Sequence, residues 1–421
     1  MLKLVQYTKD KLGLDQYTLL TADIYLERSF DSAEPVLSME WLPPGLEQRL
    51  EDEINPPGTA VVEFGIKSRR FYSVIFVEGK TFADQIRFDK NNLEEIVQWV
   101  EQETNLTYER QFKLQEWDQH EHRVVFQSSC KDIPVFPSGQ IELEMDEAGR
   151  LVLFSTYGNF PAADAIAEQE YDLAIDLKIE QLASRQCKLI HFPLSKEEKW
   201  QIVYMLEEIY VAQDKQTIIP FEWPAKPGAI IDQLMQWDAP LNAKFEAQPL
   251  NMDRIRLSPD QAFSYVYDPD EWTISENEQV AVSQKITDFL RTVFPSDSGK
   301  WRLKRMYRND AYIVAELKSM QDAIEHWHQQ KMKVFIDPGS GKVVNYLDQS
   351  WLLAAFDHYA KPDEPTISRE EAFQRIRPKL ELTPAYVYDS KQGKYVMCGK
   401  LDCRYGVCAD SGELVLLDEL A

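Results

Sequence analysis

Histidine pairs are the residues in this chain whose type and spacing come nearest to a metal site. The pairs are His120 with His122 and His326 with His328. On a β-strand, residues i and i+2 point to the same face, so such a pair can chelate a metal ion. Asp118 and Glu325 stand near enough in sequence to add a carboxylate. A metal site needs further spaced ligands, so we interpret the histidines as exposed residues in polar turns. A metal-dependent hydrolase with its site in a cleft between modules is kept as an alternative.

A basic stretch stands out in this acidic chain. It consists of Lys300, Arg302, Lys304, Arg305 and Arg308, with aromatic residues between them. These five residues are our candidates for binding an acidic protein partner or a polyanion. Charge runs are usually solvated or paired faces. The alternative interpretation is therefore a sheet face paired with neighbouring acidic modules.

The cysteines follow no metal or redox spacing. Cys398, Cys403 and Cys408 are spaced by five residues, and the chain has no C-x-x-C pair among its five cysteines. Cysteine in a strand is usually a small buried hydrophobic residue. We expect packing positions for this trio, and a reducing compartment for the protein.

Catalytic and nucleotide-binding motifs are absent from the sequence. It contains no G-x-x-x-x-G-K-[ST] or G-x-G-x-x-G loop, no H-E-x-x-H and no G-x-S-x-G. We therefore assign no catalytic residue and expect no cofactor.

Charge and composition restrict the class of protein. A net charge of −24 argues against general binding to nucleic acid and to anionic membranes, because both would repel the chain. A hydrophobic content of 44% is ordinary for a folded protein. The first residues become polar before the apolar core of a signal peptide can form. We expect a cytoplasmic protein with no membrane insertion.

Internal repetition is the strongest pattern in the sequence. Three segments each read as a strand, an Asp-to-Gly turn, a charged residue and a second apolar strand. They are residues 142–154, 333–344 and 405–416, with a degenerate copy at 209–219. Aspartate can accept a hydrogen bond from the backbone that follows it, and glycine accepts a positive φ. Each segment is therefore a predicted hairpin.

Helix-start signals precede the clear hairpins. Asn92, Ser275 and Ser368 each stand three residues before a glutamate, which is the capping-box spacing. Each predicted helix has one apolar face that a sheet must cover. We therefore predict an α+β protein of tandem units, each a helix packed on a small antiparallel sheet. The predicted domains are 1–90, 91–160, 161–240, 241–360 and 361–421, of which the first is the least regular and the third is degenerate.

The last unit also resembles a known family. The segments that carry the resemblance are residues 367–372, 382–389, 393–396, 400–402 and 410–415. They resemble the YcdB/YcdC-type repeat proteins of spore-forming Bacillales bacteria, which are similar to PepSY domains. The resemblance extends in step with the repeats over 91–157, 163–223 and 275–351. It implies a helix packed on a small sheet in each unit, a role in binding, and no catalytic residues.

A non-catalytic binding or regulatory function is our leading hypothesis. The absence of catalytic motifs, the repeated modules and the resemblance all favour it. The expected partner is a protein, with a peptidase or a cell-wall enzyme as the candidates. A metal-dependent hydrolase and a structural or assembly protein are the alternatives.

Overall fold

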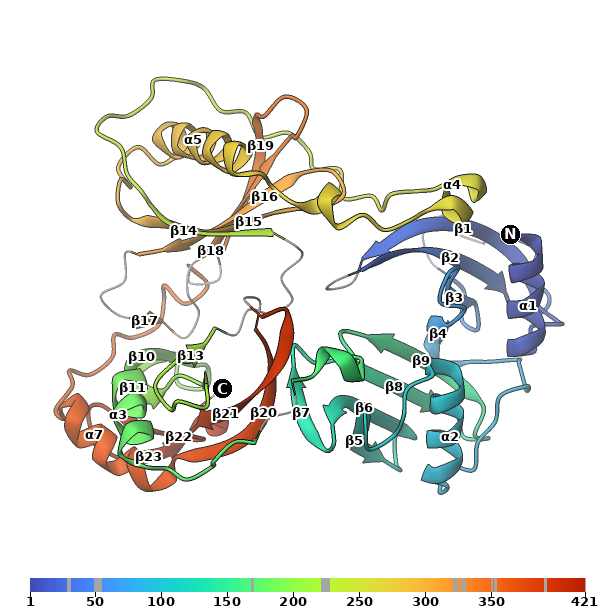
Figure 1. The fold of residues 1–421 in the computed structure, drawn as a ribbon, viewed down its shortest axis with the longest axis horizontal. Helices are drawn as coiled ribbons and strands as arrows, with labels where there is room; N and C mark the ends of the chain where they lie inside the picture. The colour runs from blue at the N-terminus through green and yellow to red at the C-terminus, as the bar shows by residue number, and fades with distance from the viewer. Residues whose placement is uncertain are drawn as a thin grey trace.

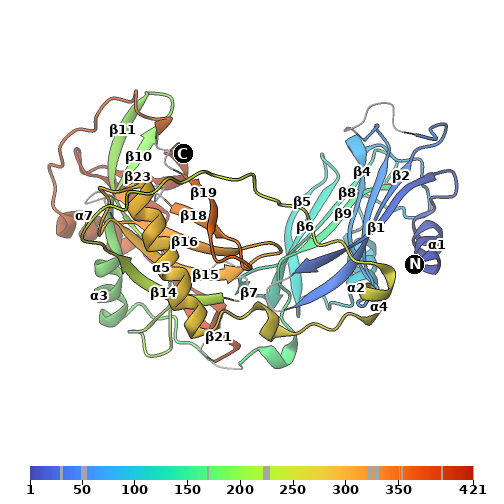
Figure 2. The same ribbon diagram turned by 90° about the horizontal axis from the view of Figure 1, so that it is seen from above.

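The computed structural model describes residues 1–28, 32–48, 55–167, 170–220, 228–320, 325–326, 331–349, 351, 354–389 and 392–420. Figures 1 and 2 show these residues in three groups. The first 157 residues, coloured from blue to teal, form the N-terminal group. Residues 228–320 and 331–349 form a second group. The third group combines green segments from the middle of the chain with red segments from its C-terminal end.

A 13-stranded sheet connects the first group to the third. Its path runs through β1 (Thr18–Arg28), β2 (Ala33–Leu42), β3 (Ala60–Gly65), β4 (Phe71–Phe76), β9 (Leu151–Tyr157), β8 (Gln140–Met145), β6 (Arg123–Cys130), β7 (Ile133–Phe136), β20 (Glu381–Asp389), β21 (Lys394–Asp402), β12 (Ile209–Val211) and β13 (Ile218–Ile219). The remaining strand, β5 (Phe112–Asp118), pairs with β6 off this path.

Two five-stranded sheets complete the described strands. One has the order β17 (Glu325–His326), β10 (Cys187–Leu194), β11 (Lys199–Leu206), β22 (Tyr405–Cys408) and β23 (Leu414–Leu416). The other has the order β14 (Gly228–Met235), β15 (Trp301–Arg308), β16 (Ile313–Ser319), β18 (Lys331–Ile336) and β19 (Val343–Asp348).

The helices are few and each buries one face against a sheet or a hydrophobic core. They are α1 (Leu2–Leu12), α2 (Leu93–Thr104), α3 (Leu177–Gln186), α4 (Pro259–Ser264), α5 (Glu276–Val293) and α7 (Arg369–Ile376), with 3-10 turns η1 (Val77–Gly79), η2 (Ala163–Ala165), η3 (Pro269–Trp272), η4 (Arg377–Lys379) and η5 (Leu417–Glu419). No helix in the described ranges combines the length and apolar character needed to cross a lipid bilayer.

The predicted helix starts are confirmed. The Asn92 side chain accepts a hydrogen bond from the Glu95 N–H, and the Ser275 side chain accepts one from the Glu278 N–H. Ser368 forms a full capping box, since the Glu371 carboxylate also accepts the Ser368 N–H at 2.8 Å. Each cap satisfies a backbone donor that has no partner inside its helix.

The predicted Asp-to-Gly turns are confirmed as well. Asp146 accepts hydrogen bonds from two following N–H groups, and Gly149 has a φ of 80°. A side chain on Gly149 would also collide with the carbonyl oxygen of Phe88. At this turn only glycine meets both the conformation and the close approach of a neighbouring segment.

The predicted architecture of tandem units, each a helix on its own small antiparallel sheet, is wrong. The large sheet runs through parts of the chain that we had assigned to separate units. β4 pairs with β9, and β12 pairs with β21, both antiparallel. β7 runs parallel to β20, where Val135 stands opposite Tyr386. The sheet is therefore mixed, and strands more than 200 residues apart in sequence are neighbours.

The unpaired edges of short hairpins explain this difference. An edge strand exposes backbone N–H and C=O groups that pair readily with another strand. β11 takes β22 as its neighbour, with Val203 opposite Cys408. Helices α3 and α7 then share one hydrophobic core, which contains Ile179 and Ile376. Local sequence patterns carry no information about which strand edges pair with each other. The predicted domain boundaries stay a prediction.

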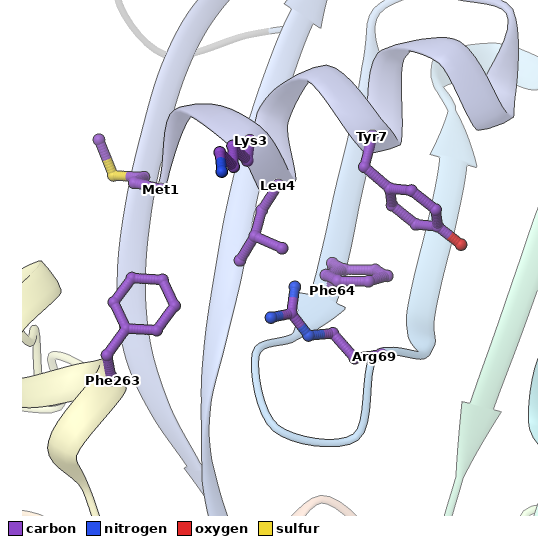
Figure 3. A pocket seen from close by; sticks show the side chains of 7 residues that line it. All are labelled: Met1, Lys3, Leu4, Tyr7, Phe64, Arg69 and Phe263. Atoms are coloured by element: carbon purple, nitrogen blue, oxygen red, sulfur yellow. The ribbon is translucent and has the colours of Figure 1, made fainter.

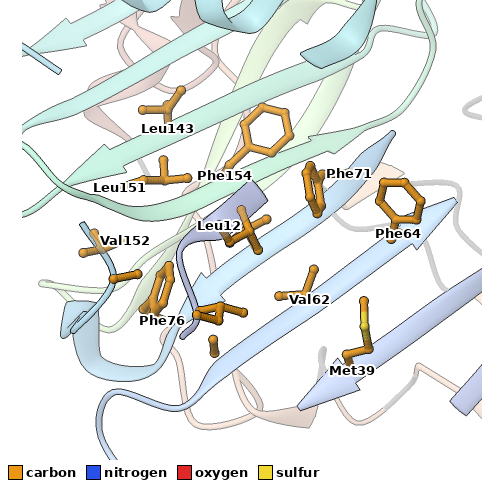
Figure 4. Close-up of a cluster of buried hydrophobic side chains, with 14 of the residues drawn as sticks. Leu12, Met39, Val62, Phe64, Phe71, Phe76, Leu143, Leu151, Val152 and Phe154 are labelled. Carbon is orange, nitrogen blue, oxygen red and sulfur yellow. The ribbon is translucent and has the colours of Figure 1, made fainter. Parts of the chain in front are cut away.

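One hydrophobic core lies between the N-terminal helices and the large sheet. It includes Leu12 of α1, Val62 and Phe64 of β3, Phe71 and Phe76 of β4 and Phe154 of β9, which Figure 4 shows packed together. Trp99 of α2 packs edge-on against Phe154, with ring centroids 5.1 Å apart. Residues from the first two predicted units thus form a single core.

A segment from the second group covers the outer edge of β1. Residues 253–264, here called the strap, contain α4 at their end (Figure 1). The Leu26 N–H donates to the Ile255 carbonyl at 2.9 Å, and the Leu257 N–H donates to the Ile24 carbonyl at 2.8 Å. These two bonds satisfy part of an edge that would otherwise be open.

Ion pairs hold the strap and its neighbours to the N-terminal group. Arg254 pairs with Glu63 at 2.7 Å and with Glu27 at 3.0 Å. At the end of β1, the Arg28 guanidinium carbon lies 3.3 Å from the centre of the Trp272 ring, and Arg28 also pairs with Asp310. A cation stacked on tryptophan gains most when it is shielded from water.

Val135 tests the continuity of the large sheet. It lies on β7, is fully buried, and packs against Tyr386, Tyr395 and Met397 from the C-terminal segment. Val135→Ala should cost on the order of 2 kcal/mol of local stability. The expected result is faster hydrogen exchange at the backbone amides of residues 385–398, measured by mass spectrometry.

Val124→Ala is the matched control, because Val124 is equally buried but belongs to the N-terminal core. Exchange at 385–398 should be unchanged in that variant. Equal effects of the two variants on residues 385–398 would contradict a specific contact between β7 and β20.

Candidate functional site

An open pocket of about 510 Å³ lies between α1, α4 and the turn that joins β3 to β4. Its lining residues are Met1, Lys3, Leu4, Tyr7, Phe64, Arg69 and Phe263. Figure 3 shows Met1 and Phe263 at one end and Tyr7 at the other, with Leu4, Phe64 and Arg69 between them. The volume falls within the range of roughly 300–1,000 Å³ that is usual for ligand pockets.

Helix α1 supplies one wall because its buried face leaves Tyr7 outside the core. Leu4 and Val5 are buried, whereas the Tyr7 side chain is 45% exposed. Phe64 is buried at the base of the pocket, and its ring lies 5.6 Å from the ring of Tyr7. The base of the pocket is therefore part of the hydrophobic core, and its rim carries the solvent-exposed aromatic side chain of Tyr7.

A carboxylate from β2 shapes the turn that carries Arg69. Glu34 accepts hydrogen bonds from the backbone N–H groups of Lys67 at 3.1 Å and Ser68 at 3.0 Å, and from the Tyr72 hydroxyl. Burial and the Glu34 carboxylate raise the pKa of Tyr72, so the phenol stays protonated and donates. Arg69 follows with a φ of 58°, and its side chain lines the pocket.

Helix α4 brings the third wall from a distant part of the sequence. Phe263 is 43% exposed, while the preceding Ala262 is buried in the N-terminal core. Lys67 Nζ donates to the Phe263 carbonyl at 2.8 Å. The same turn thus carries Arg69 and anchors α4, so the pocket depends on the docked strap.

The pocket lining combines two cations with no acidic residue. Among the described residues, Lys3 and Arg69 have no ion-pair partner. None of the seven lining residues is acidic, although the chain carries a net charge of −24. A carboxylate entering the pocket would therefore meet two cations and an apolar surface.

The predicted basic stretch is paired within its own group of strands. Lys300 pairs with Asp297 at 2.8 Å, and Arg305 pairs with Glu316 at 2.7 Å. The other pairs are Arg302 and Lys304 with Asp232, and Arg308 with Glu278. Asp297, Glu316 and Glu278 belong to the same predicted unit as the cations, whereas Asp232 belongs to the preceding predicted unit, 161–240. A role for the five cations in binding a partner stays a prediction.

The structure describes the first histidine pair but not the second. The exposed His120 lies in the turn after β5, where its backbone N–H donates to Asp118 at 2.8 Å. His122 Nε2 is 3.0 Å from Lys90 Nζ and 3.7 Å from a Glu147 oxygen. A lysine ammonium at this nitrogen competes with a metal ion for the same lone pair.

The second pair gives no further information about a metal. The backbone of His326 lies in β17, beside His191 of β10. The His326 side chain and all of His328 lie outside the described residues. In the described ranges, no group of three or more histidine, cysteine, aspartate or glutamate side chains is arranged to hold a metal ion. Metal binding by these histidines stays a prediction.

Comparisons with known proteins show no family for this chain. No family model matches it, and no curated protein matches it. Among solved structures, the C-terminal domain of Bacillus megaterium YpeB aligns with 82% of this chain and 96% of its own length. The alignment has 10% sequence identity and a TM-score of 0.25, too low to carry an argument about fold or function. The resemblance to YcdB/YcdC-type repeats therefore stays a prediction.

The three evenly spaced cysteines are buried packing residues, of which Cys398 lies in β21, Cys408 in β22 and Cys403 between these strands. Cys398, Cys403 and Cys408 are all buried, and Cys398 Sγ donates to the Ala385 carbonyl at 3.3 Å. Burial raises the pKa of Cys398 to about 12 and that of Cys187 to about 11. A nucleophilic cysteine needs a lowered pKa, so these thiols are poor nucleophiles at neutral pH.

Sequence reasoning missed the pocket because its walls come from three distant segments. One local signal was available: Ser258 and Gln261 form a capping box with Pro259 at the first helical position. These residues lie near the start of the predicted unit 241–360. A search for capping boxes there would have found α4, but not its place beside α1.

The cysteines give a direct chemical test of burial. A thiol reagent at pH 8 should label the half-buried Cys130 first, because the other four thiols are buried and their raised pKa values keep them protonated. We expect the four to react at least about tenfold more slowly. The measurement is the absorbance of the released thiolate, with labelled sites assigned by peptide mass spectrometry.

Cys130→Ser should remove the fast phase, and guanidinium chloride should make the other four thiols reactive. A fast thiol that persists in Cys130→Ser protein would show that one of the four is accessible and activated.

Proposed function

We propose that this chain is a non-catalytic binding protein, and that the pocket between α1, α4 and the β3–β4 turn holds a segment of a partner protein. The pocket itself carries the proposal. It combines half-exposed aromatic side chains with two cations that have no ion-pair partner among the described residues. Aromatic and arginine side chains are enriched where proteins bind one another.

The side chains around the pocket favour binding over chemistry. Histidine, carboxylate and cysteine side chains supply many of the general acids, bases and nucleophiles of enzymes. None of the described residues that line the pocket is of these types. Lys3 and Arg69 are instead suited to holding a negative charge, and Tyr7 and Phe263 to covering an apolar group.

The kind of partner follows only from the resemblance. A peptidase or a cell-wall enzyme is what the YcdB/YcdC-type likeness implies, and the partner's identity stays a prediction. No observation on the described residues favours a metal-dependent hydrolase, since their donor groups form no three-ligand cluster. An assembly role also stays a prediction.

Selection from a phage-displayed random peptide library tests the proposed binding site. The wild-type chain should enrich a family of related peptides. Tyr7→Ala combined with Phe263→Ala should lose at least about 90% of that enrichment, because it removes both half-exposed rings of the pocket. Sequencing of the bound phage measures the result.

Ile230→Ala combined with Val280→Ala is the matched control. Both residues are exposed and apolar, and they lie on β14 and α5, outside the pocket lining. Enrichment should be retained in that variant. Failure to select any peptide, or selection that survives loss of both rings, would overturn the proposal.

A further inference from the structure

The pocket places two cations beside exposed apolar side chains and has no acidic residue in its lining. Arg254 and Arg28 bind carboxylates that anchor the strap region, and the five cations of residues 300–308 bind carboxylates of their own group. Lys215 lies 2.8 Å from Asp172 and 3.2 Å from Asp176. With 70 acidic and 46 basic residues, an internal partner is easy to supply. The described part of the chain supplies none to Lys3 or Arg69, nor to some exposed lysines outside the pocket, such as Lys285 and Lys342. Lys3 and Arg69 differ from those lysines in lying beside exposed aromatic rings.

From the two cations, the exposed rings and the absence of an acidic lining residue we infer that the pocket recognises an acidic peptide segment with an aromatic or branched aliphatic side chain at its centre. The inference rests on the proposed function and names the chemistry of the partner. The apolar side chain would enter between Tyr7, Leu4 and Phe263, above the ring of Phe64. Flanking carboxylates would bind Lys3 on one side and Arg69 on the other.

Each half of this recognition has its own physical basis. The apolar half removes the half-exposed rings of Tyr7 and Phe263 from water. In the charged half, Arg69 can bind a carboxylate with two parallel hydrogen bonds, whereas Lys3 acts as a compact charge. The net charge of −24 repels acidic peptides from most of the surface. Binding therefore depends on the local positive charge of the pocket.

A peptide fits this pocket better than a fatty acid does. Lys3 and Arg69 are exposed, and the side chains of Met1, Tyr7 and Phe263 are each about 40% exposed or more, so the pocket is open along its rim. A fatty acyl chain is best held in a cavity that encloses most of its surface. An extended peptide can lie across an open pocket and place alternate side chains in it.

Isothermal titration calorimetry with defined ligands tests the inference. The probe is a capped hexapeptide with Phe-Leu at its centre and two acidic residues on each side. The comparison ligands carry basic flanks around Phe-Leu, or acidic flanks around Gly-Gly. The first peptide should bind at least about tenfold more tightly than either comparison, and its affinity should fall between 50 and 500 mM salt.

Charge reversal gives the sharper result. Lys3→Glu combined with Arg69→Glu should weaken the acidic peptide at least about tenfold and make the basic peptide the better ligand. Glutamate in the first turn of α1 is favourable for the helix, so folding should be retained. Circular dichroism and thermal melting check this.

Lys285→Glu combined with Lys342→Glu is the matched control, because it changes the net charge equally at exposed positions outside the pocket lining. Its peptide affinity should stay within about twofold of wild type. Unchanged binding after charge reversal at the pocket, or decanoate that binds more tightly than the acidic peptide and displaces it, would overturn the inference.

The two proposals fail in different ways. A library that selects pocket-dependent peptides without acidic residues would overturn only the inference about charge. A library that selects nothing, together with no calorimetric signal, would overturn the proposed function as well.

Discussion

Unpaired backbone groups at strand edges are the constraint on which this architecture depends. A short hairpin buries little by itself and leaves N–H and C=O groups at both edges. In this chain those edges pair with strands from distant segments: β7 with β20, β12 with β21, and β11 with β22. The result is a sheet that continues from the N-terminal group into the C-terminal one. Where β1 would remain an open edge, the strap covers part of it through two backbone hydrogen bonds.

The strap also explains why the candidate site lies where it does. It extends from the second group to the N-terminal group, where its Arg254 binds Glu27 and Glu63. Once it is docked, α4 places Phe263 opposite α1, and Lys67 ties it to the turn that carries Arg69. The pocket is thus a consequence of covering the edge strand β1. The strap that covers it also supplies α4, which completes the pocket beside α1 and β3.

The charged residues of the pocket are its second notable feature. The acidic chain neutralises many of its arginines and lysines internally, including all five residues of the basic stretch that first suggested a binding site. Sequence shows the number of charges, whereas only the folded structure shows which cations lie beside a carboxylate of the same chain. Folding pairs the five cations of the basic stretch, whereas Lys3 and Arg69, which no sequence pattern marked, have no ion-pair partner among the described residues and lie beside exposed aromatic rings.

The sequence by itself determined the features that depend on neighbouring residues. Asn92, Ser275 and Ser368 cap helices, and Asp146 and Gly149 form a turn, because each of these interactions spans four residues or fewer. Only the tertiary structure decided which strand edges pair, that Cys398 is buried against Ala385, and that Phe263 meets α1. Those contacts join segments whose local patterns are compatible with many partners. The choice among them rests on the burial and hydrogen bonding of the whole chain, which no short window of sequence contains.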